Sequence, residues 1–461
     1  MVTRASSILG AFPLLLVHAC GGAEEARDSG SASLSGITAS AGESGDATEG
    51  HSGDDDDDDG PGPGSDPDGE GSGSSSDGEG PKFDLGASDV PGNGCGGSGK
   101  GGELEFSYIW IANSSEGTVS KIDTQTGVEE GRYRTSAAGS DSPSRTSVNQ
   151  YGAVAVGNRV GAGGITKIAA TEDDCIEKNG VAGIQTSAGA ADVLAFMEDE
   201  CVLWSTPLPI ADNGPRAIAW EGGEIDPDTC ENTVPNPRLW VGYGGAAQEV
   251  YRLDGDTGTV LDHITIPGGG GLIYGGAVNA EGDLWMVNRG ANRLIRVDAM
   301  TLGFEEFAIP NTPYGMGVDA NGDPWVVSYA GGPGADHVYR FDVASATFVD
   351  AGGTSGYYRG MNLDREGRVW VGGNSPCRLA AFDAQTDTLI NDAITLPGCT
   401  TPVGVSIDVD GYVWVVDQNG TAYKVDPTTY AIQLTVSGLV GPYTYSDMTG
   451  AGLNLVVNPP G

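Results

Sequence analysis

Residues 409–416 read Val-Asp-Gly-Tyr-Val-Trp-Val-Val, and similar phrases recur upstream with the tryptophan at a near-constant interval. Each copy has a Gly-containing turn, a short β-rich run, a polar loop and a third run that ends near an Asp. A period of about 40 to 45 residues with four short strands per unit is typical of β-propeller blades. One blade cannot bury both faces of its sheet, so blades must stack around an axis. The recurring tryptophans are Trp240, Trp285, Trp325, Trp370 and Trp414.

A short opening motif marks where each blade begins. The first strand-like segment starts at Tyr108 without an opening strand, which Tyr443–Thr449 can supply. Such pairing of the chain ends would close the ring and remove exposed sheet edges. The expected fold is an all-β, seven-bladed propeller of four-stranded antiparallel blades, with an eighth blade only if Leu453–Val457 starts another sheet. The motifs are Pro143-Ser144-Arg145, Pro215-Arg216-Ala217, Ile273-Tyr274-Gly275, Pro313-Tyr314-Gly315, Tyr358-Arg359-Gly360, Pro402-Val403-Gly404 and Pro442-Tyr443-Thr444.

The N-terminal region differs in composition from the repeats. Residues 1–19 have one early cation and a short apolar core, which predicts a secretory signal. Leu16-Val17-His18-Ala19-Cys20 is similar to a bacterial lipobox, so we expect a lipid on Cys20; the alternatives are ordinary cleavage nearby and no export. Residues 20–102 are rich in Gly, Ser, Asp and Glu, which predicts a disordered acidic linker. Residues 103–461 remain for the propeller.

Negative charge extends beyond this linker. The protein has a formal net charge of −41, and 19 acidic against 3 basic residues lie between Gly21 and Lys100. The segment from Gly101 onward therefore carries −26. Because phosphate would be repelled, we exclude nucleic acid as a partner.

Six cysteines remain besides Cys20, and their places on the predicted strands favour one disulfide pairing among many. In two blades, one cysteine lies at an end of the third strand and another at the facing end of the fourth, so antiparallel pairing brings them together. Three disulfides would agree with an oxidising, exported location. The expected pairs are Cys377–Cys399, Cys175–Cys201 and, by elimination, Cys95–Cys230.

Several repeated features have structural interpretations. Turns such as Asp408-Val409-Asp410-Gly411 are similar to the start of a calcium loop, but they lack its final Glu and coincide with hairpin turns. We interpret them as turns and the tryptophans as packing anchors. Two insertions, Thr171–Glu200 and Glu221–Pro237, are expected to be ordered because the predicted disulfides hold them. An Asp expected to cap the following turn ends most third strands: Asp123, Asp254, Asp298, Asp342, Asp383 and Asp426.

The repeat unit resembles the streptogramin B lyase (virginiamycin B lyase) group of seven-bladed propellers. The resemblance extends over residues 106–457 and rests on Pro313-Tyr314-Gly315, Trp325-Val326-Val327 and Tyr339-Arg340-Phe341-Asp342. It implies a lyase that opens a cyclic depsipeptide with a His and a Glu near Mg²⁺. The family's histidine position, second in the opening motif, holds no His in any of the seven motifs. The family's glutamate position lies three residues after the blade tryptophan. In this sequence it holds an acidic residue only at Asp417, and the other blades have Asn113, Asn288, Ser328 and Gly373 there.

An acid without a histidine partner cannot complete the family's proton transfer, so Asp417 is only a weak catalytic candidate. We therefore expect no cofactor and no metal, with Mg²⁺ required only if lyase activity persists. The fold itself does not decide the matter, because propellers host unrelated activities.

The second residues of the opening motifs are better candidates for function. The chain enters the innermost strand there, so these side chains should ring one mouth of the central channel. Arginine can bind an anion through two hydrogen bonds, and tyrosine rings can pack against a sugar or a peptide ring. The structural alternative is that they plug the channel. The candidate ligand-binding residues, called the collar below, are Arg216, Tyr274, Tyr314, Arg359 and Tyr443.

The sequence therefore predicts an exported, lipid-anchored propeller that binds a ligand or protein at the collar without catalysis. A lyase or hydrolase with altered catalytic residues is the first alternative, and a structural surface protein is the second. We expect an outer-membrane lipoprotein of the cell envelope, because Gly21 is not the Asp that favours inner-membrane retention. The expected partner is a small molecule, glycan or envelope protein, the only membrane contact is the lipid, and the protein is a monomer.

Overall fold

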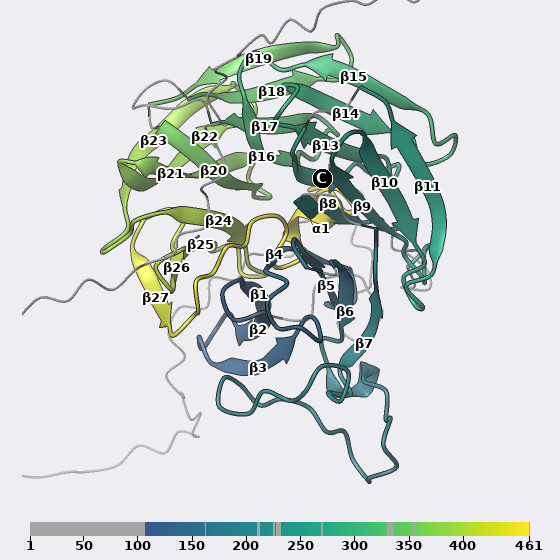
Figure 1. Ribbon diagram of the computed structural model, residues 1–461. Coiled ribbons are helices and arrows are strands. Elements are labelled where there is room, and N and C mark those ends of the chain that lie inside the picture. Colours follow the sequence, from purple (N-terminus) through teal and green to yellow (C-terminus); the bar gives the residue numbers. More distant parts are fainter. Residues whose placement is uncertain are drawn as a thin grey trace, which may run out of the picture. The chain divides into compact units, whose positions relative to one another are not determined.

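The computed structural model describes residues 107–460 except 162, 210–212, 225, 227–231, 269–270, 330–335 and 355. Within these residues the chain forms seven antiparallel sheets around a central axis (Figure 1). Every strand pairs with the next strand of its own blade, so each blade is a meander. The expected seven-bladed propeller is confirmed.

Six blades have four strands and one has three. The three-stranded sheet consists of β1 (Tyr108–Asn113), β2 (Thr118–Asp123) and β3 (Glu129–Arg134). The next three sheets consist of β4 (Pro143–Val148), β5 (Val154–Asn158), β6 (Gly164–Ile168) and β7 (Val202–Thr206); β8 (Asn213–Trp220), β9 (Leu239–Gly244), β10 (Gln248–Leu253) and β11 (Val260–Ile266); and β12 (Ile273–Val278), β13 (Leu284–Asn288), β14 (Arg293–Val297) and β15 (Phe304–Ala308). The last three consist of β16 (Pro313–Val318), β17 (Pro324–Ser328), β18 (Val338–Asp342) and β19 (Thr347–Gly352); β20 (Gly356–Leu363), β21 (Arg368–Ser375), β22 (Cys377–Asp383) and β23 (Thr388–Thr395); and β24 (Pro402–Ile407), β25 (Val413–Asp417), β26 (Thr421–Val425) and β27 (Ile432–Ser437).

The C-terminal segment completes the three-stranded blade. Asn113, at the end of β1, forms an antiparallel bridge with Pro442. Trp110 in the same strand donates its backbone N–H to Met448 O at 2.9 Å. Residues 443–449 thus lie beside β1 in the place of an opening strand, and the expected closure of the ring is confirmed.

The alternative of an eighth blade is wrong, because Leu453–Val457 lies in a helix, α1 (Ala451–Val457). Gly450 precedes it with a φ of 88°, a conformation that favours glycine. Asp447 then accepts the N–H groups of Gly450 at 2.8 Å and Leu453 at 3.0 Å, which turns the chain into a helix. The apolar face of α1 contacts β12, β16, β20 and β24 and closes one end of the channel. No helix in the described part of the chain has the length and apolarity to cross a membrane.

The blade tryptophans are core residues, as expected: all five are at most 1% exposed. In three blades the indole Nε1 donates to the first Asp of the preceding turn, and the pair Trp414–Asp408 has a distance of 2.9 Å. The second oxygen of Asp408 accepts the N–H groups of Asp410 at 3.1 Å and Tyr412 at 2.9 Å. These carboxylates hold a turn and an indole, which supports the turn interpretation.

The aspartates at the ends of the third strands cap turns. Each accepts the backbone N–H of the residue three positions later at 2.7 to 2.9 Å. In Asp298 the N–H of Thr301 is the main cause of a lowered carboxyl pKa. The six aspartates that we expected to cap these turns are therefore structural residues.

Two disulfides have the expected pairing. The two cysteines of Cys175–Cys201 are 26 positions apart in the sequence, and those of Cys377–Cys399 are 22 apart. Cys20, Cys95 and Cys230 lie outside the described residues, so the third pair and the lipid stay predictions.

The insertion Thr171–Glu200, which begins with a short 3₁₀ helix, η1 (Glu172–Asp174), is held by the first disulfide. Ser187 Oγ accepts the N–H of Arg132 in β3 at 3.1 Å. The insertion Thr171–Glu200 is therefore ordered, as expected, and contacts the outer strand of the blade that closes the ring. The second insertion, Glu221–Pro237, includes residues 225 and 227–231, which lie outside the described residues, so its order stays a prediction.

Candidate ligand-binding site at the channel mouth

A bulge at the start of the innermost strands creates the candidate site. Pairing of β16 with β17 includes Pro313 and resumes only at Met316, so Tyr314 and Gly315 leave the ladder. The same irregularity occurs in β4, β8, β12, β20 and β24. A bulge interrupts the alternation of side chains between the two faces of a strand, which allows these residues to meet across the axis.

The structure brings all five collar residues together. Tyr314 and Tyr443 share a hydrogen bond between their hydroxyls, and Arg359 Nη1 donates to Tyr314 OH at 3.1 Å. The Arg216 guanidinium lies 4.5 Å from the ring centre of Tyr274. No collar side chain is more than 7% exposed. These contacts connect blades on different sides of the ring, so the collar fills the channel mouth.

Two residues at the centre of this cluster were not expected from the sequence. Arg145 is the third residue of its motif and Tyr445 lies two positions after Tyr443, and both are fully buried. Arg145 Cζ lies 2.9 Å from the ring centroid of Tyr445. Arg145 Nε donates to the carbonyl oxygens of Arg216 at 2.9 Å and Tyr274 at 3.2 Å. The signal for Arg145 is the bulge at Ser144, because Arg145 is the residue that re-enters the ladder directly after it, opposite Gly157.

Half-buried residues form the rim of the site, and each directly follows the second strand of its blade. Arg159 Cζ lies 4.6 Å from the ring centre of Tyr443. Arg289 Cζ lies 4.8 Å from the ring centre of Tyr329, whose hydroxyl also accepts a hydrogen bond from Arg359 at 3.0 Å. These rim residues could have been found in the sequence, because each directly follows the position that the lyase resemblance assigns to the catalytic acid. Solvent can reach the cluster through this partly exposed rim.

Four arginines at the mouth have no carboxylate partner among the residues that the structure describes. In the described part of the chain, Arg145, Arg159 and Arg216 donate to carbonyl and hydroxyl oxygens, Arg289 lies against tyrosine rings, and none of the four forms an ion pair. Two buried N–H groups, Arg145 Nη1 and Arg216 Nε, have no hydrogen-bond partner there. Outer-strand arginines differ: Arg340 contacts two aspartates at 2.7 Å.

The tyrosines of the cluster differ in acidity. Burial raises the pKa of Tyr314 and Tyr443 above the ordinary value. Burial also acts to raise the pKa of Tyr445, but the charges of Arg145 and Arg216 outweigh it and lower this pKa to about 8. Tyr445 therefore ionises at a lower pH than Tyr314 and Tyr443.

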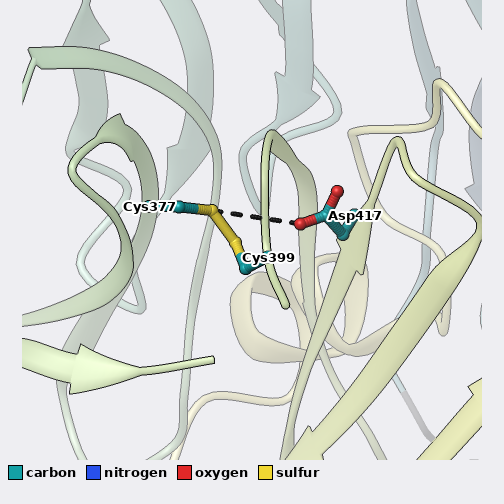
Figure 2. A group of neighbouring side chains, drawn as sticks. All are labelled: Cys377, Cys399 and Asp417. Atoms are coloured by element: carbon teal, nitrogen blue, oxygen red, sulfur yellow. Dashed lines mark hydrogen bonds between the residues drawn. A yellow bond between two sulfur atoms is a disulfide. The ribbon is translucent and has the colours of Figure 1, made fainter. Parts of the chain in front are cut away.

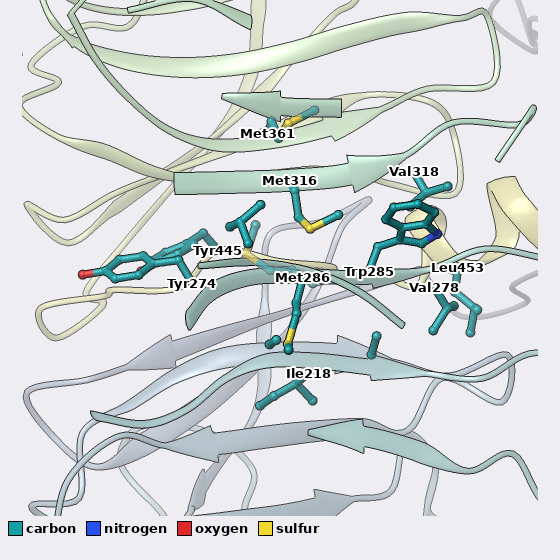
Figure 3. Packing of buried hydrophobic residues seen from close by; sticks show 14 of the residues in the cluster. Ile218, Tyr274, Val278, Trp285, Met286, Met316, Val318, Met361, Tyr445 and Leu453 are labelled. Atoms are coloured by element: carbon teal, nitrogen blue, oxygen red, sulfur yellow. The ribbon is translucent and has the colours of Figure 1, made fainter. Parts of the chain in front are cut away.

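The interior of the channel is apolar. Figure 3 shows Tyr274 and Tyr445 at one end, Leu453 of α1 at the other, and methionines between them. A hollow beside α1 is lined mainly by apolar atoms, and its one carboxylate, Asp447, caps the helix. The charged end of the channel is therefore the collar end.

Asp417, the weak catalytic candidate, lies apart from the collar at the end of β25. Its carboxylate accepts the N–H groups of Thr400 at 2.6 Å and Thr401 at 3.2 Å. Cys377 Sγ lies 3.9 Å from Asp417 Oδ2 and is bonded to Cys399 (Figure 2). The three side chains are close enough for a metal, but disulfide sulfurs are not thiolate ligands. One carboxylate occupied by backbone N–H groups does not fit Mg²⁺, so Asp417 holds the loop after Cys399.

The two described histidines lie away from the innermost strands. His263 in β11 contacts Glu249 at 2.7 Å, and His337, just before β18, contacts Asp350 at 2.8 Å. Neither lies in the collar, so the described residues provide no histidine at the mouth.

Solved structures have the same architecture. The chain is similar in fold to streptogramin B lyase. A structure of that enzyme has a TM-score of 0.51 at 16% identity and covers 68% of this chain and 89% of its own. A protein from Lactobacillus plantarum has a TM-score of 0.50 at 15% identity, with 73% and 98% covered. Virginiamycin B lyase from Staphylococcus aureus has a TM-score of 0.47 at 14% identity, with 67% and 89% covered.

The first two of these likenesses show the propeller fold alone. No protein-family model and no curated protein matches the sequence.

Proposed function

We propose that this protein is an exported, lipid-anchored propeller that binds a ligand at the collar. The observation that carries the proposal is a set of four arginines at the mouth that have no carboxylate partner among the described residues: Arg145, Arg159, Arg216 and Arg289. Buried charges in proteins are ordinarily paired. A group of unpaired guanidiniums is therefore suited to an anionic group from outside, which arginine can bind through two parallel hydrogen bonds.

A structural plug is the competing role for the collar. Apolar side chains would fill a channel at lower cost than buried cations, because desolvation of a charge opposes folding. Buried N–H groups at Arg145 and Arg216 without acceptors add to that cost. A binding role accounts for both features, since the ligand supplies the missing acceptors.

Export and lipid attachment rest on the residues before the propeller. The lipobox-like stretch that ends at Cys20 motivates the lipid. The disulfides Cys175–Cys201 and Cys377–Cys399 support an oxidising compartment, because such bonds are rare in a reducing cytosol. We propose an outer-membrane lipoprotein whose propeller contacts the membrane only through this anchor.

Lyase or hydrolase activity is the alternative. A general base must lie within hydrogen-bond reach of the proton it removes. His263 lies on the outer strand β11, His337 lies just before β18, and Asp417 is engaged with backbone N–H groups. Binding without catalysis is therefore the function that we favour.

The test measures melting temperature and affinity together. Small organic acids, sugar phosphates and neutral sugars are screened by thermal shift against the full-length protein, with a streptogramin B antibiotic plus Mg²⁺ as the catalytic arm. We expect a stabilising compound whose affinity falls about 10- to 100-fold in Arg216→Ala and Arg359→Ala. A lower melting temperature with unchanged affinity in both variants would leave only the plug. Magnesium-dependent ring opening that is lost in Asp417→Asn would establish the lyase instead.

A further inference from the structure

Arg145 and Arg216 place two guanidinium groups on one tyrosine. Arg145 Cζ lies 2.9 Å from the ring centroid of Tyr445, and Arg216 Nη1 donates to the hydroxyl of that residue at 3.2 Å. Arg145 is fully buried and Arg216 is 6% exposed. Two like charges thus lie close together where little water screens them, and such a pair requires a compensating anion.

Each of these guanidiniums also retains one buried N–H group without an acceptor in the described part of the chain, at Arg145 Nη1 and Arg216 Nε. Oxygen atoms of a carboxylate or phosphate are strong acceptors for such groups. On the basis of the proposed function, we infer that the ligand of the collar is a small oxyanion, a carboxylate or a phosphate, bound between Arg145 and Arg216. Arg145, outside the five collar residues, is then a principal ligand-binding residue.

The space around Tyr445 limits the size of this ligand. A narrow void beside Tyr445 is lined by glycines and methionines of three neighbouring inner strands. A Cβ atom at Gly315 would lie 2.2 Å from the carbonyl oxygen of Arg359, and one at Gly360 would lie 2.6 Å from that of Val403. Neither Arg145 nor Arg216 lines this void, so the ligand must reach the two arginines from the rim, and the close packing of these strands leaves room on their side of Tyr445 only for a small group.

The net negative charge of the propeller also favours a small ligand. The chain from Gly101 onward carries −26, so a long polyanion would be repelled wherever it extended beyond the mouth. A small anion avoids this repulsion because it contacts only the cationic cluster.

The test uses the full-length protein and isothermal titration with inorganic phosphate, succinate, heparin and a neutral disaccharide, cellobiose. We expect phosphate or succinate to bind, and the stronger of the two identifies the class of oxyanion. Its affinity should fall at least about tenfold in Arg145→Gln and in Arg216→Gln. Arg365→Gln is the matched control and should bind like the wild type, because Arg365 is exposed and donates to Asn458 O beyond the end of α1.

Arg145→Lys, which keeps the charge but loses the planar fork, replaces Arg145→Gln if that variant does not fold. Binding of heparin or cellobiose alone, lost in the Arg216 variant, would overturn the small-oxyanion inference and retain the proposed function. Phosphate or succinate binding that is equal in the Arg145, Arg216 and Arg365 variants would also overturn the inference. If none of the four probes binds and the variants only have lower melting temperatures, both the small-oxyanion inference and the proposed binding function are contradicted.

Discussion

The guanidinium of Arg145 lies over the ring of Tyr445, with 2.9 Å between Cζ and the ring centroid. Arg145 belongs to β4, whereas Tyr445 belongs to the segment that closes the ring beside β1. The contact is electrostatically favourable for either state of the phenol, because a cation is attracted to an aromatic face and still more to a phenolate. One pair of residues thus links closure of the propeller to the charge at its mouth.

Stability should rise with pH between about 8 and 10 through Tyr445. The pKa of Tyr445 is lowered from 10.0 to about 8 by its arginine neighbours, so the folded state binds fewer protons than the unfolded state in this window. The stabilisation is fully present above the unfolded pKa and is lost as pH falls through the folded pKa; it amounts to about 3 kcal/mol. This stabilisation can be measured by urea denaturation of the wild type and of Tyr445→Phe below pH 8 and above pH 10. The same pH dependence in both proteins would contradict this role. The groups that face Tyr445 are Arg145, Arg216, Tyr274, Tyr314 and Tyr443.

Anion binding should weaken over the same range of pH. Once Tyr445 ionises, its phenolate neutralises the guanidiniums that otherwise bind the ligand, so ligand and phenolate compete. Succinate or phosphate titrations should therefore give an affinity that falls above pH 8 in the wild type. Tyr445→Phe, which keeps the ring, should bind with nearly constant affinity; a parallel loss in this variant would exclude competition by Tyr445.

The carboxylate of Asp408 should be important for stability, although it lies far from any candidate site. It accepts hydrogen bonds from Trp414 Nε1 at 2.9 Å and Tyr412 N at 2.9 Å, and it pairs with Lys424 at 2.8 Å. Asp408→Ala would remove the nearest carboxylate from the buried Lys424, leaving it Thr124 O at 2.8 Å and Asp410 at 3.9 Å, and would leave the indole N–H without its acceptor. The variant should cost about 3 kcal/mol in urea denaturation. Asp410→Ala, in the same turn with a side chain 42% exposed, should change stability little. Equal effects of the two variants would show that the turn alone matters.

The repeat made much of the fold predictable, because each blade must place its tryptophan and its turn residues in the same way. Ring closure and two disulfides followed from where strands begin and end. The helix α1 was less predictable, since an apolar run as short as Leu453–Val457 fits a strand or a helix, and its cap, Asp447, lies outside the run.

The collar was predictable as a position but not as a set of contacts. The bulges at the opening motifs break the alternation on which inward and outward positions are assigned, so Arg145 and Tyr445 escaped notice. Likewise, Asp417 had the right spacing for a catalytic acid, but hydrogen bonds to the loop after Cys399 could be recognised only in three dimensions.

Lipid anchoring through Cys20 has a separate test. Cys20→Ser should move the protein from the membrane fraction to the soluble fraction, because the apolar stretch before it is too short to span a bilayer. A matched Cys95→Ser variant should remain with the membranes. If Cys20→Ser still sediments with membranes after a high-salt wash, the anchor is not this cysteine.

The most direct test of the central claim is a crystal structure of the propeller soaked with selenate, an oxyanion whose selenium can be located by anomalous scattering. The account predicts a peak between Arg145 and Arg216, with selenate oxygens within hydrogen-bond distance, about 2.7–3.2 Å, of Arg145 Nη1 and Arg216 Nε. A mouth without an anomalous peak, in which both N–H groups contact acceptors from the protein itself, would contradict it.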